Sequence, residues 1–243
     1  MFYSFKKRSC SILQIKIDLK IFIVVLIFLL TRQLEIYCVI MLFAILHELG
    51  HLITGMILGF KPRKIKILPV GVSACIDMNV KNYNKKLKSA NVLALKKIII
   101  AISGPITNSI IAFVCGFFEV SLFNISTEFI VFSNLLIGFF NLIPIYPLDG
   151  GRIVKSIIHI KAGLKNSYKY TYMLSNITII FLTIISSIAI LYLKNISILI
   201  ILIYLWIMVI IENKRYNSKM NIYKLIENID DNDECECTSF VEV

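Results

Sequence analysis

Two histidines and a glutamate lie close together in the segment Leu46–Gly55, LHELGHLITG, inside a long apolar run. His47 and His51 are four residues apart, so on a helix they lie one turn apart on the same face and can reach one ion. Zinc suits two neutral imidazoles and leaves positions for a carboxylate and a water. Glu48 lies on a neighbouring face, close enough to take a proton from that water. The spacing predicts a zinc site with Glu48 as the general base.

The cost of these groups supports a metal site. Each ionisable side chain in the middle of a membrane helix costs about 2.5–3.5 kcal/mol on insertion scales. The chain has only three histidines, and two of them fall at this spacing around a glutamate. The alternative is a pair of histidines that are hydrogen-bonded inside a helical bundle without a metal. Three costly groups at one depth favour the zinc site.

Catalytic zinc sites usually have three protein ligands, so a third ligand must come from elsewhere in the chain. Three candidates are unfavourable. Asp18 lies near the mouth of the first expected span, and Cys38 lies on the helix of the histidines but too far along it. Cys115 lies deep in a later span without supporting polar residues. Asp149 remains as the candidate.

Asp149 lies in the segment Phe140–Ile153, FNLIPIYPLDGGRI. Pro144 and Pro147 remove backbone donors and disfavour a regular helix before them. Irregular backbone at membrane depth is tolerated only where protein encloses it or where it lines a watery cavity. The alternative is a plain interfacial turn, because Asp-Gly is common in turns. Beside the two histidines, the segment predicts Asp149 as a metal ligand.

Other polar residues near these motifs have two interpretations. Asn141, about two turns before Asp149, is the candidate substrate-binding residue, because its amide can hydrogen-bond an extended substrate backbone; it can equally satisfy a neighbouring helix. Ser103-Gly104-Pro105, with Asn108, is expected to serve close helix packing and a kink. His159 lies in a basic loop and is expected to be solvated.

Membrane-spanning helices must position these residues. The 243 residues are 58% hydrophobic and 17% charged, with a mean hydropathy of +0.81, which exceeds what a soluble globular chain shows. We predict an all-α polytopic membrane protein with about six transmembrane helices and a small β-like element after the second. The expected spans, each near the length that a bilayer requires, are residues 19–34, 37–59, 97–118, 129–148, 173–193 and 196–212.

The basic residues predict the orientation. With six spans, both termini and the loops 60–96 and 149–172 share one side, and the 26 Lys and Arg residues lie in or beside these regions, except Arg32 and Lys194. Cytoplasmic loops carry an excess of Lys and Arg. We therefore predict a multi-pass protein of the cell membrane, in contact with the lipid bilayer, with both termini cytoplasmic.

Two further segments carry expectations. Lys64–Ile76, KIKILPVGVSACI, is rich in β-branched residues and predicts a short strand or hairpin near the membrane surface. It either touches anionic lipid or holds an extended peptide by strand addition. Residues 1–212 are expected to form one six-span domain, followed by a short cytoplasmic tail, 213–243. Cys235 and Cys237 lie in its acidic end, expected to be disordered, where neither metal nor lipid attachment is favoured.

These motifs resemble a known family. HELGH on an early span and NLIPIYPLDGGR on a later one are similar to the site-2 protease family of intramembrane zinc metalloproteases. ILPVG and SGPITN resemble the same family. The six-span plan without a PDZ-like insertion resembles the branch of stage IV sporulation protein FB. The resemblance covers roughly residues 15–215.

The resemblance implies one zinc ion per chain, held by His47, His51 and Asp149, with Glu48 activating water. It implies proteolysis of a membrane-associated protein substrate within or beside the bilayer. For the sporulation branch, the substrate is an inactive sigma-factor precursor, a pro-sigma factor, in the mother-cell membrane around the forespore. Membrane inhibitor proteins are expected as further partners. Other members of the branch carry a C-terminal CBS domain, for which residues 213–243 are too few.

Three alternative functions are less consistent with the sequence. A metal or proton transporter uses midplane ionisable residues, but acidic and polar residues are sparse on the other spans. A zincin of the CAAX-processing type would supply a glutamate from a later helix, yet the last two spans have no acidic residue before Glu212. Aromatic residues do not alternate with the basic clusters, so no direct nucleic-acid contact is expected.

Overall fold

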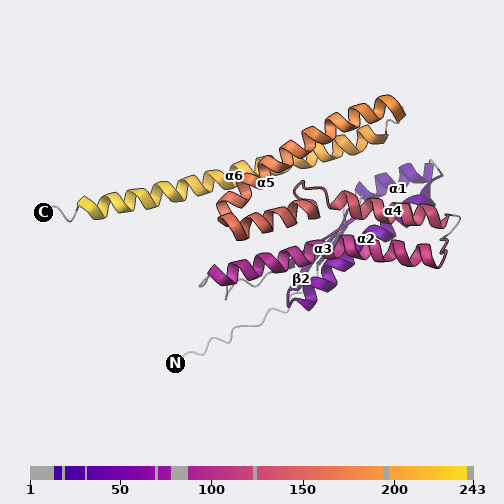
Figure 1. Ribbon diagram of the computed structural model, residues 1–243, viewed down its shortest axis with the longest axis horizontal. Coiled ribbons are helices and arrows are strands. Elements are labelled where there is room, and N and C mark those ends of the chain that lie inside the picture. The colour runs from indigo at the N-terminus through magenta and orange to yellow at the C-terminus, as the bar shows by residue number, and fades with distance from the viewer. Residues whose placement is uncertain are drawn as a thin grey trace. The chain divides into compact units, whose positions relative to one another are not determined.

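The computed structural model describes residues 14–17, 20–30, 32–68, 71–77, 87–122, 125–193 and 197–239. The chain divides into two compact units, Met1–Asn141 and Leu142–Val243. The first contains β1 (Gln14–Ile17), α1 (Lys20–Leu30), α2 (Leu34–Ile57), β2 (Lys61–Leu68), β3 (Gly71–Asp77), α3 (Leu87–Phe117) and α4 (Thr127–Asn141) (Figure 1). The second contains α5 (Asp149–Leu193) and α6 (Ser197–Ser239).

Helix α2 carries the HELGH motif and has a well-defined end. Gly59 has a left-handed φ of 87°, which costs glycine no steric strain. In this conformation Gly59 N donates to Met56 O and Phe60 N donates to Gly55 O, both at 3.0 Å. These two bonds form a Schellman motif, which satisfies the last carbonyls of the helix. The sequence therefore fixes where α2 stops and β2 begins.

In the first unit, α2 packs on α3, and α3 packs on α4. The buried cluster at one end consists of Val39 and Phe43 from α2, Ile130 from α4, and Ile125 just before it. Larger apolar side chains on the outer faces are exposed, which is the pattern expected where lipid covers a helix bundle. This core packs α2 against α4, and Ile111 and Cys115 of α3 lie against it.

The first unit also contains a three-stranded sheet in the order β1-β2-β3. β2 and β3 are antiparallel, with Ile65 opposite Ala74 and Leu68 opposite Gly71. β1 runs parallel to β2. The two antiparallel strands lie where the segment Lys64–Ile76 predicts a hairpin, and β3 lies at the edge of the sheet.

The second unit differs from the sequence prediction. Residues 149–172 were expected to form a loop, but α5 includes them, with one break at Gly163, where φ is 80° and ψ is 175°. Residues 213–239 were assigned to a tail, but α6 continues through them. Charge excluded both segments from a membrane span, yet Lys, Arg and Glu are good helix formers. A segment that is too polar to span a membrane can therefore still be helical.

Three helical segments among the described residues are long and apolar enough to cross a membrane: Leu34–Ile57, Asn91–Phe117 and Asp149–Tyr192. Thr127–Asn141 is apolar but shorter. Helix α1 has 11 residues, a length of about 16 Å, against a hydrocarbon core of about 30 Å. The helical membrane class agrees with the prediction, whereas the count of six spans still rests on the sequence.

Candidate metal centre

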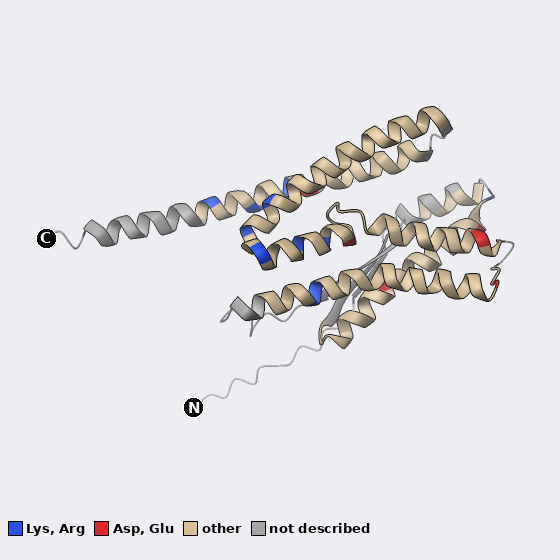
Figure 2. Ribbon diagram, in the orientation of Figure 1, with Lys and Arg blue, Asp and Glu red and all other residues tan. Residues whose placement is uncertain are grey.

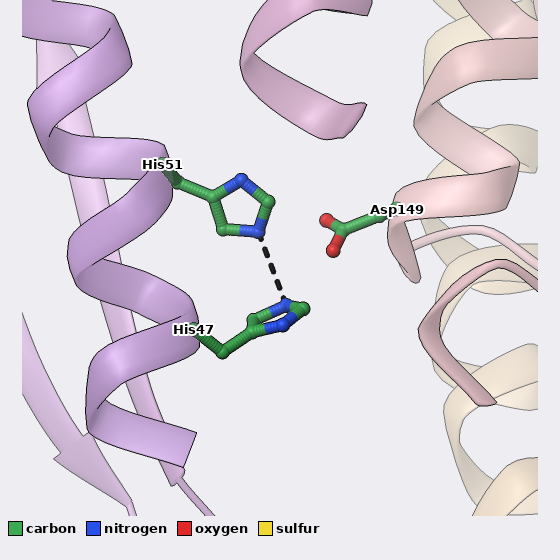
Figure 3. Close-up of side chains that lie close together, drawn as sticks. All are labelled: His47, His51 and Asp149. Atoms are coloured by element: carbon green, nitrogen blue, oxygen red, sulfur yellow. Dashed lines mark hydrogen bonds between the residues drawn. The ribbon is translucent and has the colours of Figure 1, made fainter. Parts of the chain in front are cut away.

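The side chains of His47 and His51 meet on one face of α2. Both are buried, with 6% and 3% of their surfaces exposed. Their Nε2 atoms are 3.2 Å apart, and the ring planes are nearly perpendicular, at 88°. Figure 3 shows the two rings projecting from successive turns of the helix. The spacing of four residues therefore produces the shared face that the sequence predicts.

A backbone carbonyl of α3 determines the proton position on His51. His51 Nδ1 lies 2.6 Å from Ile100 O, and a carbonyl can only accept a hydrogen bond, so Nδ1 donates. The lone pair of the neutral ring is then on Nε2, which is the form that ligates a metal. Ser103 Oγ donates to the same carbonyl at 2.7 Å. Helix α3 thus orients one of the two imidazole rings that the sequence predicts as metal ligands.

Two glycines allow α2 and α3 to approach each other at this point. A Cβ atom on Gly104 would overlap His51 and would lie 2.7 Å from His47 Nε2. A Cβ atom on Gly50 would overlap Thr107 Oγ1 and lie 3.1 Å from Ser103 O. Real Cβ atoms do not approach other atoms so closely. Gly104 therefore keeps open the space in front of both imidazoles.

Asp149 is the first residue of α5 and is 4% exposed. The segment before it is not helical: Ile145 N donates to Ile143 O at 2.7 Å, and Leu148 N donates to Ile145 O at 2.8 Å. The Tyr146–Pro147 peptide bond is cis. The two prolines thus break the helix where the sequence predicts, and Asp149 starts a new helix with a buried carboxylate.

The glycines after Asp149 have a steric role. A Cβ atom on Gly150 would overlap the backbone of Leu142, and one on Gly151 would overlap the backbone of Tyr146. The segment 142–148 therefore folds back directly over the first turn of α5, which only glycines permit. Arg152 adds contacts from the same turn: Nε donates to Pro147 O at 3.0 Å, and Nη1 lies 3.6 Å from Asp149 Oδ1.

His47, His51 and Asp149 form a group whose ligand atoms all lie within 4.8 Å of one another (Figure 3). Each residue is buried and offers one ligand atom. Two imidazoles and one carboxylate are a ligand set found in catalytic zinc sites, which leave a fourth position for water or substrate. The residues present therefore fit a zinc ion. Glu48, on the neighbouring face of α2, is half-exposed.

Among the described residues, Cys38, Cys115 and His159 are not part of this group. Asn141 ends α4, and its Nδ2 donates to Ile137 O of the same helix at 3.0 Å. Cys38 is exposed and Cys115 half-buried, both as free thiols. His159 is half-buried and lies on α5 rather than in a loop. Asp18 lies outside the described residues, as do the side chains of Cys235 and Cys237.

The sequence did not predict all of the residues that position the two imidazoles. It assigned residues 103–105 to packing, and the structure adds that Gly104 faces the imidazoles and that Ser103 shares a carbonyl with His51. The SGP motif was the available signal. The Ile100 carbonyl left no signal, because any residue supplies a main-chain oxygen.

Known proteins resemble this chain in sequence and fold. The model of peptidase family M50 matches residues 35–126 and 120–185. A zinc metalloprotease of Methanocaldococcus jannaschii is 35% identical over 133 residues, covering 51% of this chain and 34% of that protein. Stage IV sporulation protein FB of Bacillus subtilis is 29% identical over 145 residues, covering 59% and 47%. The chain thus spans a third to a half of these relatives.

One solved structure shares the fold. The site-2 protease from Methanocaldococcus jannaschii superposes with a TM-score of 0.58 and 24% sequence identity. The match covers 81% of this chain and 89% of that chain. At this level of identity, the likeness is one of fold.

Proposed function

Because the chain belongs to peptidase family M50, we propose that it is an intramembrane zinc metalloprotease that hydrolyses a peptide bond in a membrane-associated protein. The observation that carries the proposal is the buried group of two imidazoles and one carboxylate. The family match also confirms the resemblance that the two motifs indicate.

In the proposed mechanism, a zinc ion would act as a Lewis acid that polarises the scissile carbonyl and makes a water molecule more acidic. His47, His51 and Asp149 are the proposed ligands. Glu48 takes a proton from the attacking water and passes it to the leaving amine, as a general base and then a general acid. Ile100 O holds His51 in the tautomer that ligates through Nε2, and Gly104 keeps the space before both rings open.

The substrate must be extended at the cleaved bond, because a helix hides its carbonyls in its own hydrogen bonds. The edge strand β3 is the proposed element that holds the peptide, by adding it as a further strand. Asn141 is the proposed residue that hydrogen-bonds its backbone. Asn141→Ala should therefore raise KM while zinc content stays unchanged. Asn166→Ala is the matched control, because Asn166 makes the same bond one turn back, to Ala162 O, at an exposed position. Equal effects of the two variants would remove Asn141 from the substrate site.

The proposal includes the predicted topology, with six spans in residues 1–212, both termini in the cytoplasm and a short tail, 213–243. It also includes a role in sporulation, supported by the likeness to stage IV sporulation protein FB. In that role the substrate is a pro-sigma factor, the location is the mother-cell membrane around the forespore, and membrane proteins inhibit cleavage. These details extend the general proposal, and the failure of any of them would leave the general proposal intact.

The test is co-expression with candidate membrane-associated pro-proteins, including a pro-sigma factor. The intact chain should cleave its substrate, while Glu48→Gln should retain zinc and lose cleavage by at least about 100-fold, the lower range for a general base. Glu35→Gln, in the first turn of the same helix, is the matched control and should cleave normally. Undiminished cleavage by Glu48→Gln would contradict the protease proposal, and so would zinc flux by the intact chain in liposomes without any cleavage.

A further inference from the structure

Tyr146 lies three residues before Asp149, and its backbone is anchored to a distant part of α5. Tyr146 N donates to Ser175 Oγ at 3.1 Å, across 29 residues of sequence. Ser175 is buried, with 4% of its surface exposed. A backbone N–H that is partly shielded from water is stabilised by a protein partner, and here the partner is a side chain in the apolar part of α5. The bond thus ties the segment 142–148 to the middle of that helix.

The Tyr146 side chain is held by a cation. Lys155 Nζ lies 4.3 Å from the centre of the Tyr146 ring and 3.9 Å from that of Tyr168. Both distances are within the range of attractive cation–π contacts, which strengthen when water is excluded.

Helix α6 completes this cluster. Lys219 Nζ lies 4.6 Å from the Tyr168 ring centre, and the rings of Tyr172 and Tyr216 stack at 4.3 Å. Asn213 Nδ2 donates to Asn176 Oδ1 at 3.0 Å. These contacts clamp the polar part of α6 onto α5, next to the residues that hold Tyr146.

The cluster is too tightly packed to be a ligand pocket. Its residues surround a cavity of about 20 Å³, room for a single water molecule. The side chains that surround it include Tyr146, Lys155, Tyr168, Thr171, Ser175 and Glu212. A cavity of this size has no room for a substrate or a cofactor.

We propose that Ser175 and Lys155 are positioning residues that fix the segment 142–148 and, through it, the Asp149 carboxylate. The inference rests on the proposed zinc site, in which Asp149 is a ligand. Within the segment, the described backbone bonds are the two short-range ones from Ile145 N and Leu148 N. The bond from Tyr146 N and the cation between two rings therefore join the Arg152 Nε–Pro147 O bond in fixing where the segment lies before α5 begins. Residues that orient a metal ligand typically change affinity or activity 10–100-fold when replaced.

Ser175→Ala tests the hydrogen bond. It should weaken cobalt or zinc binding about 10-fold in chelator competition and lower kcat by a similar factor, with KM unchanged. The absorption spectrum of the cobalt-loaded protein should also change, because the carboxylate ligand moves. Ser175→Thr keeps the hydroxyl and should restore all three readouts. Ser187→Ala is the matched control, since Ser187 Oγ donates only along the same helix, to Thr183 O at 2.8 Å.

A second pair of variants tests the cation. Lys155→Met keeps the length of the side chain and removes its charge, so it should weaken metal binding and lower kcat about 10-fold. Lys155→Arg keeps the charge and should retain most of both. Lys161→Met, at an exposed position of the same helix, should behave as the intact chain. If Ser175→Ala does not unfold cooperatively in detergent, it is not folded properly, and the two Lys155 variants then test the positioning role.

The outcomes separate this inference from the proposed function. If the intact chain binds zinc and cleaves substrate, while Ser175→Ala and Lys155→Met match it in metal affinity, cobalt spectrum and kcat, only the positioning roles are overturned. If the intact chain binds no metal, the proposed function fails first. A matched loss of affinity and kcat in both variants, reversed by Ser175→Thr and Lys155→Arg, supports the inference.

Discussion

The imidazoles of His47 and His51 depend on two backbone features of α3. Ile100 O accepts the Nδ1 proton of His51, and Gly104 presents no side chain to either ring. The first feature leaves a lone pair on Nε2, and the second leaves room for an ion in front of it. The HExxH spacing alone provides only the shared face. A second helix, α3, is thus needed before the two histidines of α2 can hold an ion.

Gly104→Ala should weaken zinc binding at least about 10-fold, because the methyl group overlaps the space in front of both rings. Chelator competition on the purified protein measures this. Gly116→Ala is the matched control in the same helix, since its Cβ would lie 3.4 Å from Val131 Cγ2, an ordinary contact. Equal zinc affinity of the two variants would show that Gly104 does not border the ion.

For single residues, the sequence indicates the ionisable side chains of the candidate site more readily than the contacts that position them. His47, Glu48, His51 and Asp149 stand out because ionisable residues are rare in apolar segments. The hydrogen bonds of Ser103 and Ser175 cannot be predicted in this way, because a serine in a helix bonds to its own backbone as readily as to a neighbour. Their partners emerge only when the fold brings distant residues together.

Among the elements, the start of α5 is the most constrained. The segment 142–148 crosses the first turn of the helix so closely that Gly150 and Gly151 have no space for a side chain. The prolines of this segment prevent α4 from continuing, and Asp149 is the residue at which a helix becomes possible again. The carboxylate therefore lies at a helix N-terminus, where a negative charge is favoured.

Gly150→Ala should destabilise the protein by about 1–3 kcal/mol, the usual cost of overpacking, and should abolish zinc retention by displacing Asp149. Gly163→Ala provides the comparison. A Cβ atom on Gly163 would have open space, but the φ of this residue is 80°. The substitution should therefore cost about 1–2 kcal/mol of stability, and the protein should keep its zinc. Thermal unfolding in detergent and zinc content measure the two effects. Retention of zinc by Gly150→Ala would contradict the steric account.

The elements themselves were predicted unevenly. The break near Pro144 and the strands near Lys64–Ile76 follow from local chemistry, namely missing donors and β-branched residues. The helices over 149–172 and 213–239 did not, because a basic segment was equated with a loop. Residues 164–172 pack against α6 through tyrosines, and such pairing between distant residues is not visible in a single sequence.

At the scale of the whole molecule, charge and apolar surface are separated along the second unit. In the second unit, the described Lys and Arg residues lie on the first part of α5 and on α6 beyond residue 213 (Figure 2). The described parts of 176–193 and 197–212 carry no base and expose isoleucines, among them Ile180, Ile184 and Ile203. Exposed apolar side chains over such a length indicate contact with lipid.

Single-cysteine labelling should test the orientation, in a background without the six native cysteines. Lys161→Cys should react with a membrane-impermeant thiol reagent only from the cytoplasmic side, because it lies among basic residues. Glu119→Cys, in the connection between α3 and α4, should react only from the opposite side. Labelling of both from one side would exclude the proposed six-span topology.

The count of spans is the part of the molecule that the helices alone do not determine. Helix α1 is short and α4 ends at Asn141, so length and hydropathy identify fewer spans than the sorting of charges does. The charge pattern acts over the whole chain, whereas helix length is a local property. Both observations are consistent with a membrane protein.

The most direct test is the zinc content of the purified protein after dialysis against a chelator of fixed strength. The intact chain and His159→Ala, a control histidine outside the ligand set, should retain about one zinc ion per chain. His51→Ala and Asp149→Ala should both lose nearly all of it. If Asp149→Ala retains as much zinc as the intact chain, the carboxylate is not a ligand and the proposed metal centre is wrong.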